Sequence, residues 1–380
     1  MQRRDAIKTA AVGLMVLSSG GVIAAEPQVE VLSTKVIEPS RTAYIGWPTL
    51  TRRKNGQLLL VASGTRESHV CPFGSVQLFR SNDDGQTWLL PQTIMDTPTD
   101  DRDAGILETA SGTLLATTFT SNAYVSILKK ARSAGNWDAE RLALWEAAAA
   151  RITPAELQAT LGTWMMRSTN GGITWSEPYR SIVNSPHGPI ALQDGTIFYA
   201  GVSLWKEDRF VGAVVSKDDG KTWKKLSAIP TRPGDDSANY HELHAVETPS
   251  GRIIVQVRNH NSTNSGETLQ TESTDGGKTW TMLHSIGVWG LPSHLLRLRD
   301  GRLLMSYGYR RKPYGNQARV SADEGRTWSP PMTISDDGPG HDLGYTSTVE
   351  LSDGKLLSVW YEKMAGSTKA VLRQATWSIK

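Results

Sequence analysis

Ionisable and aromatic side chains of this chain recur just before and just after short apolar runs. Arginine guanidinium groups bind carboxylates in a fork geometry, and histidine, aspartate and glutamate can transfer protons. This combination suits an anionic substrate and acid–base chemistry. The residues with this placement are Trp47, Arg66, Glu67, His69, Asp100, Asp101, Arg102, Asp103, His187, Tyr240, His241, Glu242, His244, Arg258, His260, His294, Arg310, Arg311, His341, Asp342, Tyr345, Tyr361 and Glu362.

An eight-residue motif, S-x-D-x-G-x-T-W, is repeated five times and indicates what positions these side chains. Its Asp or Asn bonds its own backbone in a tight turn, its Gly adopts a conformation that other residues resist, and its Trp packs into an apolar layer. Five copies indicate a repeat protein. They span Ser81 to Trp88, Ser168 to Trp175, Ser216 to Trp223, Ser273 to Trp280 and Ser321 to Trp328, with Asn170 replacing aspartate in the second.

Six turn dipeptides followed by apolar runs alternate with these motifs and predict β-hairpins. Their spacings of 56, 83, 56, 50 and 53 residues give a unit of about fifty, near the period of propeller blades. We therefore predict an all-β, six-bladed propeller over residues 26–380. The dipeptides are Asn55-Gly56, Ser111-Gly112, Asp194-Gly195, Ser250-Gly251, Asp300-Gly301 and Asp353-Gly354.

The two ends of the chain are predicted to close the ring. Residues 28–36 and 369–379 both alternate in polarity, and the sixth hairpin has no S-x-D-x-G-x-T-W motif after it. An N-terminal strand that completes the last blade would leave the circle without an open edge. The hairpins and motifs would then share one face, so the chemically versatile residues would gather at the opposite mouth.

The 83-residue interval predicts an insertion in the second blade, at about residues 133–161. Residues 136–150 are rich in Ala, Leu, Glu and Arg, and Thr153-Pro154-Ala155-Glu156 has the pattern of a helix start. We expect two short helices between the second and third strands of this blade, at the rim of the mouth.

Residues 1–25 have the features of an export signal. Arg3-Arg4 precedes an apolar run from Ala10 to Val22, which favours a twin-arginine signal and a periplasmic or secreted protein. Without this segment the net charge falls from +3 to about +1, and no basic stripe indicates nucleic-acid binding. The single cysteine, Cys71, excludes an internal disulfide, and no cysteine near the cleavage site suggests a lipid anchor.

The repeated motifs are similar to the Asp-boxes of the bacterial sialidase (neuraminidase) superfamily of six-bladed propellers. The resemblance covers nearly the whole mature chain, and it implies a glycoside hydrolase of exo-α-sialidase type. Gly344-Tyr345-Thr346-Ser347 resembles the stretch that carries the tyrosine nucleophile of the family, and Glu242 matches the glutamate that takes its proton. Arg258, Arg310 (or its neighbour Arg311) and Arg66 match arginines of the family site.

Two departures affect the expected substrate. Gly46-Trp47-Pro48 replaces the motif that carries the first arginine of the family, and no aspartate follows Arg66 at the place of its general acid. His69, Glu67 or Asp103 would then supply the acid. The implied activity is retaining hydrolysis of a terminal acidic sugar such as sialic acid, because a neutral tyrosine is not repelled by the carboxylate of the sugar.

Two other functions remain open. A lyase acting on uronate glycans would use His187, His244 or a tyrosine to take a proton, and a non-catalytic propeller would only bind glycans. His294 joins His187 and His244 as a candidate substrate ligand. His241-Glu242-Leu243-His244 is one residue short of the zinc-binding motif H-E-x-x-H, so we expect no metal ion. We also expect that the protein has no cofactor and that it is a monomer.

Overall fold

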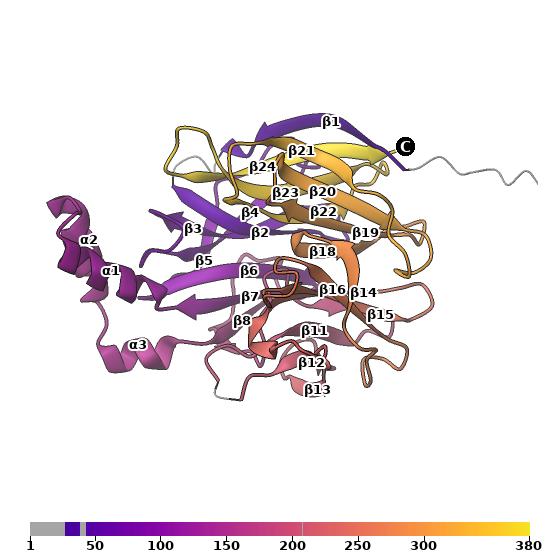
Figure 1. The fold of residues 1–380 in the computed structure, drawn as a ribbon, viewed down its shortest axis with the longest axis horizontal. Helices are drawn as coiled ribbons and strands as arrows, with labels where there is room; N and C mark the ends of the chain where they lie inside the picture. The colour runs from indigo at the N-terminus through magenta and orange to yellow at the C-terminus, as the bar shows by residue number, and fades with distance from the viewer. Residues whose placement is uncertain (1–26, 39–42, 207) are drawn as a thin grey trace, which may run out of the picture.

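The computed structural model describes residues 27–38, 43–206 and 208–380. It contains six four-stranded antiparallel sheets, which confirms the six-bladed propeller, and Figure 1 shows their strands from the side. The predicted export signal lies outside the described residues. No helix in the described part of the chain is long and apolar enough to cross a membrane.

Blades 1 to 5 each follow the chain order of their strands. Blades 1 to 3 are β2 (Tyr44–Arg52), β3 (Leu58–Arg66), β4 (Ser75–Ser81) and β5 (Gln92–Met95); β6 (Asp100–Glu108), β7 (Leu114–Ser121), β8 (Thr163–Ser168) and β9 (Tyr179–Arg180); and β10 (Ile190–Ala191), β11 (Ile197–Val202), β12 (Val211–Ser216) and β13 (Lys224–Ala228). Blades 4 and 5 are β14 (Tyr240–Glu247), β15 (Ile253–Asn259), β16 (Thr268–Ser273) and β17 (His284–Val288); and β18 (Leu291–Arg297), β19 (Leu303–Tyr309), β20 (Tyr314–Ser321) and β21 (Met332–Gly338).

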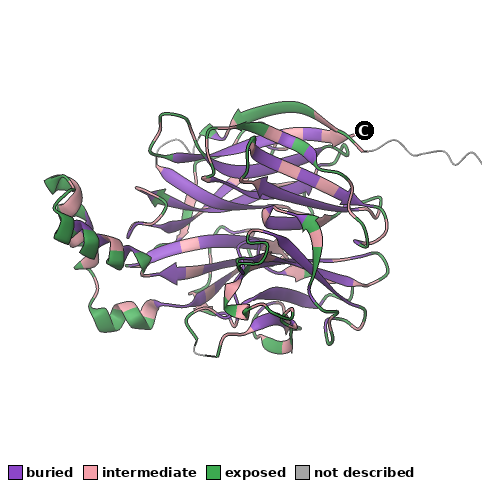
Figure 2. Ribbon diagram, viewed as in Figure 1, coloured by how far each residue is buried: buried purple, intermediate pink, exposed green. Residues whose placement is uncertain are grey.

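Blade 6 closes the ring as predicted. It consists of β22 (Leu343–Glu350), β23 (Leu356–Lys363), β24 (Ala370–Ile379) and the N-terminal strand β1 (Val29–Val36). Strand β1 pairs antiparallel with β24 from Val29 opposite Ile379 to Val36 opposite Arg373. Figure 2 shows β1 as a mostly exposed outer strand over buried inner strands.

The turns form through local hydrogen bonds. In the first S-x-D-x-G-x-T-W motif, Asp83 accepts hydrogen bonds from Ser81 Oγ, Thr87 N and Thr87 Oγ1 at 2.6–2.9 Å. The glycine of each hairpin dipeptide has φ between 84° and 90°, which only glycine adopts without strain. The turns therefore form wherever the motif occurs, because their hydrogen-bond partners lie within the motif itself.

The first motif also joins the first blade to the last. Trp88 Nε1 donates to Gln374 Oε1 at 2.7 Å, and Gln374 Nε2 donates to the Gly85 carbonyl at 2.9 Å. Gln374 lies on β24 and is 2% exposed. These two hydrogen bonds hold blade 6 to blade 1 at the closure of the ring.

Substituting Gln374→Met tests this closure. Methionine keeps the approximate length of the side chain but leaves the Trp88 indole N–H and the Gly85 carbonyl without their partner, so we expect a loss of about 1–3 kcal/mol in the free energy of unfolding. Urea unfolding measures it, with Gln86→Met at an exposed position of the same motif as control. Equal midpoints for both variants would show that the contact is not stabilising.

The insertion in blade 2 is larger than predicted. It lies between β7 and β8 as expected, but it contains three helices, α1 (Ala123–Ala134), α2 (Ala139–Ala149) and α3 (Pro154–Thr160). The capping box of Thr153 and Glu156 is present at the start of α3. Helix α1 was missed because Asn122 makes no side-chain cap and because Val125 and Ile127, near the start of the helix, are β-branched residues that favour strands.

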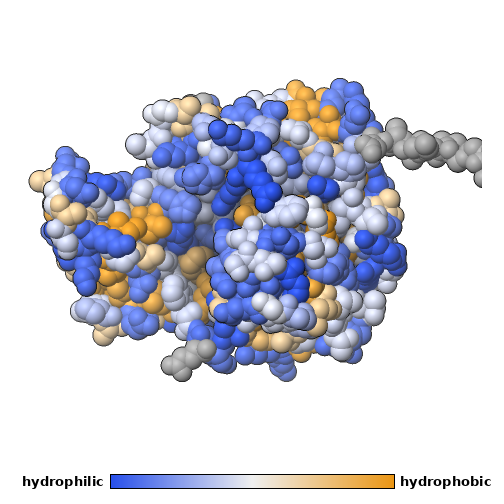
Figure 3. Space-filling model, viewed as in Figure 1, coloured by the Kyte–Doolittle hydropathy of each residue, from blue (hydrophilic) through white to orange (hydrophobic). Residues whose placement is uncertain are grey.

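Helices α1 and α2 have their own small core beside the mouth. Tyr124, Leu128 and Trp145 pack with the buried Cys71 of blade 1. Figure 1 shows the helices extending beyond the ends of the strands, away from the C-terminus, and Figure 3 shows apolar surface on them where they meet the propeller. The insertion therefore forms a wall at the mouth side of the molecule.

Candidate active site

The first strands of three blades carry the same irregularity at the mouth. The strand register shifts between Gly46 and Thr49 in β2, between Arg102 and Gly105 in β6, and between Gly344 and Ser347 in β22. Each bulge contains one residue with a left-handed backbone, namely Trp47 (φ 55°), Asp103 (φ 39°) and Tyr345 (φ 55°). Side chains in this conformation cost free energy and cluster at functional sites. The bulges therefore present these three residues at equivalent places around the central axis.

Tyr345 and Glu242 form a short hydrogen bond across the axis. Tyr345 Oη donates to Glu242 Oε1 at 2.6 Å, and Arg258 Nη1 donates to the same oxygen at 2.9 Å and to Tyr345 Oη at 3.4 Å. Glu242 comes from β14 and Arg258 from the neighbouring β15. The structure thus brings together the predicted nucleophile, its predicted base and one predicted arginine.

The neighbours within this trio set the protonation states of Glu242 and Tyr345 in the resting site. Burial alone would raise the pKa of Glu242, but the Arg258 guanidinium and the hydrogen bond from Tyr345 lower it to about 2. Burial and the Glu242 carboxylate raise the pKa of Tyr345 well above its usual value. Tyr345 is therefore neutral and Glu242 ionised at neutral pH.

Asp103 is a buried carboxyl group beside this trio. It is 6% exposed, and its Oδ1 atom has no hydrogen-bond partner among the described residues. Burial raises the pKa of Asp103 to about 6. The nearby Arg102 guanidinium lowers this pKa, and the Glu242 carboxylate raises it further. Asp103 and Glu242 line one cavity of about 160 Å³. A carboxyl group with this pKa can hold and release a proton near neutral pH.

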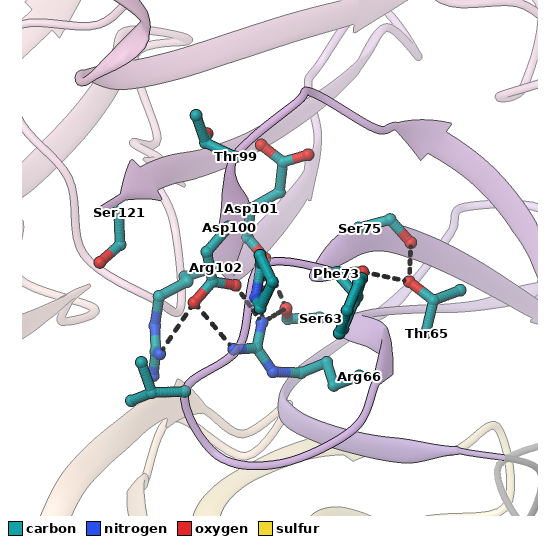
Figure 4. Close-up of polar contacts among 12 residues, drawn as sticks. Ser63, Thr65, Arg66, Phe73, Ser75, Thr99, Asp100, Asp101, Arg102 and Ser121 are labelled. Carbon is teal, nitrogen blue, oxygen red and sulfur yellow. Dashed lines mark hydrogen bonds and ion pairs between the residues drawn. The ribbon is translucent and has the colours of Figure 1, made fainter. Parts of the chain in front are cut away.

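Arg66 lies inside the protein wall. Its guanidinium forms two hydrogen bonds to Asp100, at 2.6 and 2.9 Å, and one to Ser63 Oγ at 2.8 Å (Figure 4). The Arg66 side chain is fully buried, and Trp47 lies 4.9 Å from its guanidinium carbon. In this arrangement Arg66 supports Trp47 and does not line the cavity of Asp103 and Glu242. This placement differs from the expectation that Arg66 contacts a substrate.

The other two candidate acids are held by neighbours. Glu67 accepts a hydrogen bond from the Trp145 indole and pairs with Arg141, both on α2. His69 Nδ1 lies 3.1 Å from a carboxylate oxygen of Asp342, and burial lowers the pKa of His69. Both side chains therefore have roles in the wall, which leaves Asp103 as the candidate with a free oxygen.

Arg310 approaches Tyr345 from blade 5. Its Nε donates to the Leu343 carbonyl at 2.8 Å, and its guanidinium carbon lies 5.7 Å from the centre of the Tyr345 ring. Arg311 instead lies over Trp289, at 4.9 Å. Of the two neighbouring arginines, Arg310 is thus the one at the site.

Three of the histidines predicted at the mouth lie deeper. His187, His244 and His294 are buried and contact one another in the central channel, with ring centres 4.7–5.3 Å apart. They line a cavity of about 360 Å³ with residues from the hairpin ends of the first strands, such as Arg52 and Glu350. Burial keeps the pKa of His187 and His244 well below the usual value.

This depth corrects the assignment of these histidines to the mouth. The sequence showed that they precede or begin first strands, but not how far along the channel each side chain lies. Only His187 approaches Tyr345, with ring centres 6.5 Å apart. Within the described ranges, no three His, Cys, Asp or Glu side chains are arranged to hold a metal ion.

Sequence reasoning did not assign a role to several mouth residues. Arg102 lies over Trp47 at 4.4 Å and donates to Asp100 at 3.3 Å. His260 Nε2 is 2.7 Å from Arg258 Nε, and its ring lies 4.5 Å from that of His241. These residues were recognised as mouth residues, but nothing in the sequence ranked them, because their partners come from other strands.

A family model described as BNR repeat-like domain matches residues 133–359, more than half of the chain. A sialidase of Bacteroides fragilis (strain YCH46) is 25% identical over 224 residues, which cover 52% of this chain and 39% of that protein. A xyloglucanase of Paenibacillus sp is 29% identical over 175 residues, or 40% of this chain and 16% of that protein. This chain thus spans less than half the length of these relatives.

Solved structures share the propeller. A Dyadobacter fermentans protein of unknown function has a TM-score of 0.74 at 23% identity, covering 93% of this chain and 99% of that one. The intramolecular trans-sialidase from Ruminococcus gnavus has a TM-score of 0.60 at 13% identity, covering 90% and 95%. NanB sialidase from Streptococcus pneumoniae reaches 0.62 at 16%, covering 90% and 68%. The matched family model, the sialidase relative and this shared fold identify the chain as a BNR-repeat member of the sialidase superfamily.

Proposed function

We propose that this chain is a retaining glycoside hydrolase that releases a terminal acidic sugar, such as sialic acid, from a glycan. The observation that carries the proposal is the 2.6 Å hydrogen bond from Tyr345 Oη to Glu242 Oε1, with Arg258 beside both. A tyrosine is a weak nucleophile unless a base takes its proton during attack. The sialidase relative from Bacteroides fragilis supports the substrate class.

In the first step, Tyr345 Oη attacks the anomeric carbon of the sugar while Glu242 takes the phenolic proton. Asp103 gives its proton to the glycosidic oxygen, which leaves as an alcohol. In the second step, water attacks the same carbon and gives a proton to Asp103. Tyr345 leaves and recovers its proton from Glu242, so two inversions retain the configuration.

Substrate binding would prepare the base. Arg258 and Arg310 can both donate to a carboxylate on the sugar. When Arg258 turns part of its charge to the substrate, it stabilises the ionised form of Glu242 less, so the pKa of this group rises towards the value a base needs. An acidic sugar would thereby activate the nucleophile that cleaves it.

The test is release of a fluorophore from the aryl glycoside of sialic acid by the purified chain, with the first product anomer identified by NMR. We expect turnover with retention. Inversion would contradict a tyrosine nucleophile. An ultraviolet-absorbing unsaturated product would instead indicate a lyase, and tight binding without turnover would indicate a glycan-binding propeller.

We further infer that residues 1–25 direct export by the twin-arginine route, because Arg3-Arg4 precedes the apolar run. Changing both arginines to lysine should retain the protein in the cytoplasm of the producing bacterium, as cell fractionation would reveal. Unchanged export of the double variant would favour the general secretory route.

A further inference from the structure

A second cavity at the mouth lies beside the candidate active site, between blades 5 and 6. It has a volume of about 650 Å³, within the range of small-molecule sites. Its lining includes Arg310, His341 and Lys363, which we call the basic lobe, together with His69 and Asp342. The guanidinium carbon of Arg310 also lies 5.7 Å from the centre of the Tyr345 ring, so this residue borders both the cavity and the proposed catalytic centre.

The basic lobe has uncompensated positive charge. Neither Arg310 nor Lys363 forms an ion pair with a carboxylate among the described residues. By contrast, Arg66 and Arg102 both pair with Asp100, and Glu242 pairs with Arg258. Arg66, Arg102 and Arg258 thus each contact a carboxylate of the protein, whereas Arg310 and Lys363 do not.

The one carboxylate among the lining residues, Asp342, can offset only one of the two cations Arg310 and Lys363. Asp342 accepts hydrogen bonds from Tyr44 and Tyr361, each at 3.0 Å, and lies 3.1 Å from His69 Nδ1. Burial alone would raise the pKa of Asp342, but the contact with His69 lowers it to about 2. The carboxylate oxygens of Asp342 are therefore occupied by partners from blade 1 and blade 6. The backbone N–H of Lys363 donates to the backbone carbonyl of Asp342, which places the two residues side by side.

Unpaired cations in a concave site favour an anionic ligand. Arg310 is a planar donor that suits a carboxylate or sulfate, and Lys363 supplies a mobile point charge. Since Arg310 borders both the catalytic centre and the lobe, a glycan with one acidic sugar at Tyr345 would place its next unit against His341 and Lys363.

We propose that the basic lobe is a subsite for a second anionic sugar unit, so that the preferred substrates are glycans with two neighbouring acidic units. The second unit would carry a carboxylate or a sulfate. This inference rests on the proposed function for its position relative to the cleaved bond, but the binding of an anionic sugar to the lobe can be measured without turnover.

The experiment is an NMR titration with single sugars, followed at the backbone amide signals of His341 and Lys363, which line the lobe and not the catalytic centre. Galactose 6-sulfate and glucuronate are compared with neutral galactose, on the purified chain and on Lys363→Gln. Lys355→Gln is the matched control, because Lys355 is an exposed lysine of the hairpin face that pairs with Asp353. The two charged probes distinguish sulfate from carboxylate recognition.

We expect the charged sugars to bind at least about tenfold more tightly than galactose, as a hydrogen-bonded ion pair allows. The preference should weaken with added salt and be lost in Lys363→Gln, while Lys355→Gln keeps it. Equal binding of charged and neutral sugars, or an unchanged preference in Lys363→Gln, would overturn the subsite. Failure of the proposed function would show separately, as absence of turnover of the aryl glycoside by a protein that still prefers charged sugars.

Discussion

Replacing Tyr345 with phenylalanine is expected to lower kcat for a sialic acid aryl glycoside by at least about 10³-fold, the magnitude typical for loss of a nucleophile. Phenylalanine keeps the aromatic ring between Trp47 and Tyr361, whose centres lie 6.5 and 6.0 Å from that of Tyr345. It removes only the oxygen that would form the covalent bond. The affinity for the sugar should change little, because Arg258 and Arg310 remain.

Two measurements separate this role from damage to the fold. Tyr307→Phe is the matched control, since it removes a buried hydroxyl that bonds Gln317 within blade 5. Both variants should unfold at similar denaturant concentrations, and only Tyr345→Phe should lose turnover. A fluorinated sugar that slows the second step should leave its mass on a peptide containing Tyr345. Full activity of Tyr345→Phe, or labelling of another residue, would disprove the assignment.

Replacing Asp103 with asparagine is expected to remove the pH dependence of the reaction above about pH 6. Asp103 must hold a proton to give it to the leaving oxygen, and burial raises the pKa of Asp103 to about 6. In the unaltered protein kcat/KM should be highest below this pH and fall about tenfold for each pH unit above it. Asparagine has no such proton, so the variant should show no fall in this range.

The size of the loss should depend on the leaving group. Alkyl glycosides need a proton on the departing oxygen, so their kcat/KM should fall about 10²- to 10⁴-fold in Asp103→Asn. Aryl glycosides with acidic phenols need little help and should lose far less. An equal loss for both substrates would mean that Asp103 positions other groups, and an unchanged pH profile would direct attention to His69.

The same substitution should stabilise the protein at pH 7. A carboxyl group whose pKa is higher in the folded than in the unfolded state binds more protons when folded, so stability falls as the pH rises from about 4 to 6. At pH 7 the buried charge of Asp103 therefore costs up to about 3 kcal/mol, which a neutral asparagine avoids. Urea unfolding of Asp103→Asn at pH 7 and pH 4 should show this gain only at pH 7.

The fold was predictable because its signals are local. The S-x-D-x-G-x-T-W motif closes its turn with hydrogen bonds within eight residues, as between Asp83 and Thr87, and each hairpin depends on one glycine. Their order along the chain determined six blades, and the alternating terminal segments determined the closure of β1 against β24. Helix α1 escaped because its stabilising contacts, of Tyr124 and Leu128 with Trp145 and Cys71, come from distant segments.

The sequence also predicted Tyr345, Glu242, Arg258 and Arg310 as site residues, through the resemblance of the stretches around them to the sialidase superfamily. The tertiary structure alone decided which residues face the cavity. A bulge in β6 turns Asp103 to the place that is equivalent to that of Tyr345. Arg66 is enclosed by Asp100 and Trp47. The three histidines His187, His244 and His294 lie inside the channel. The physical reason is that one residue of register reverses the direction of a strand side chain. The hydrogen bonds of the site, in turn, depend on partners far along the chain, as between Tyr345 and Glu242 across 103 positions.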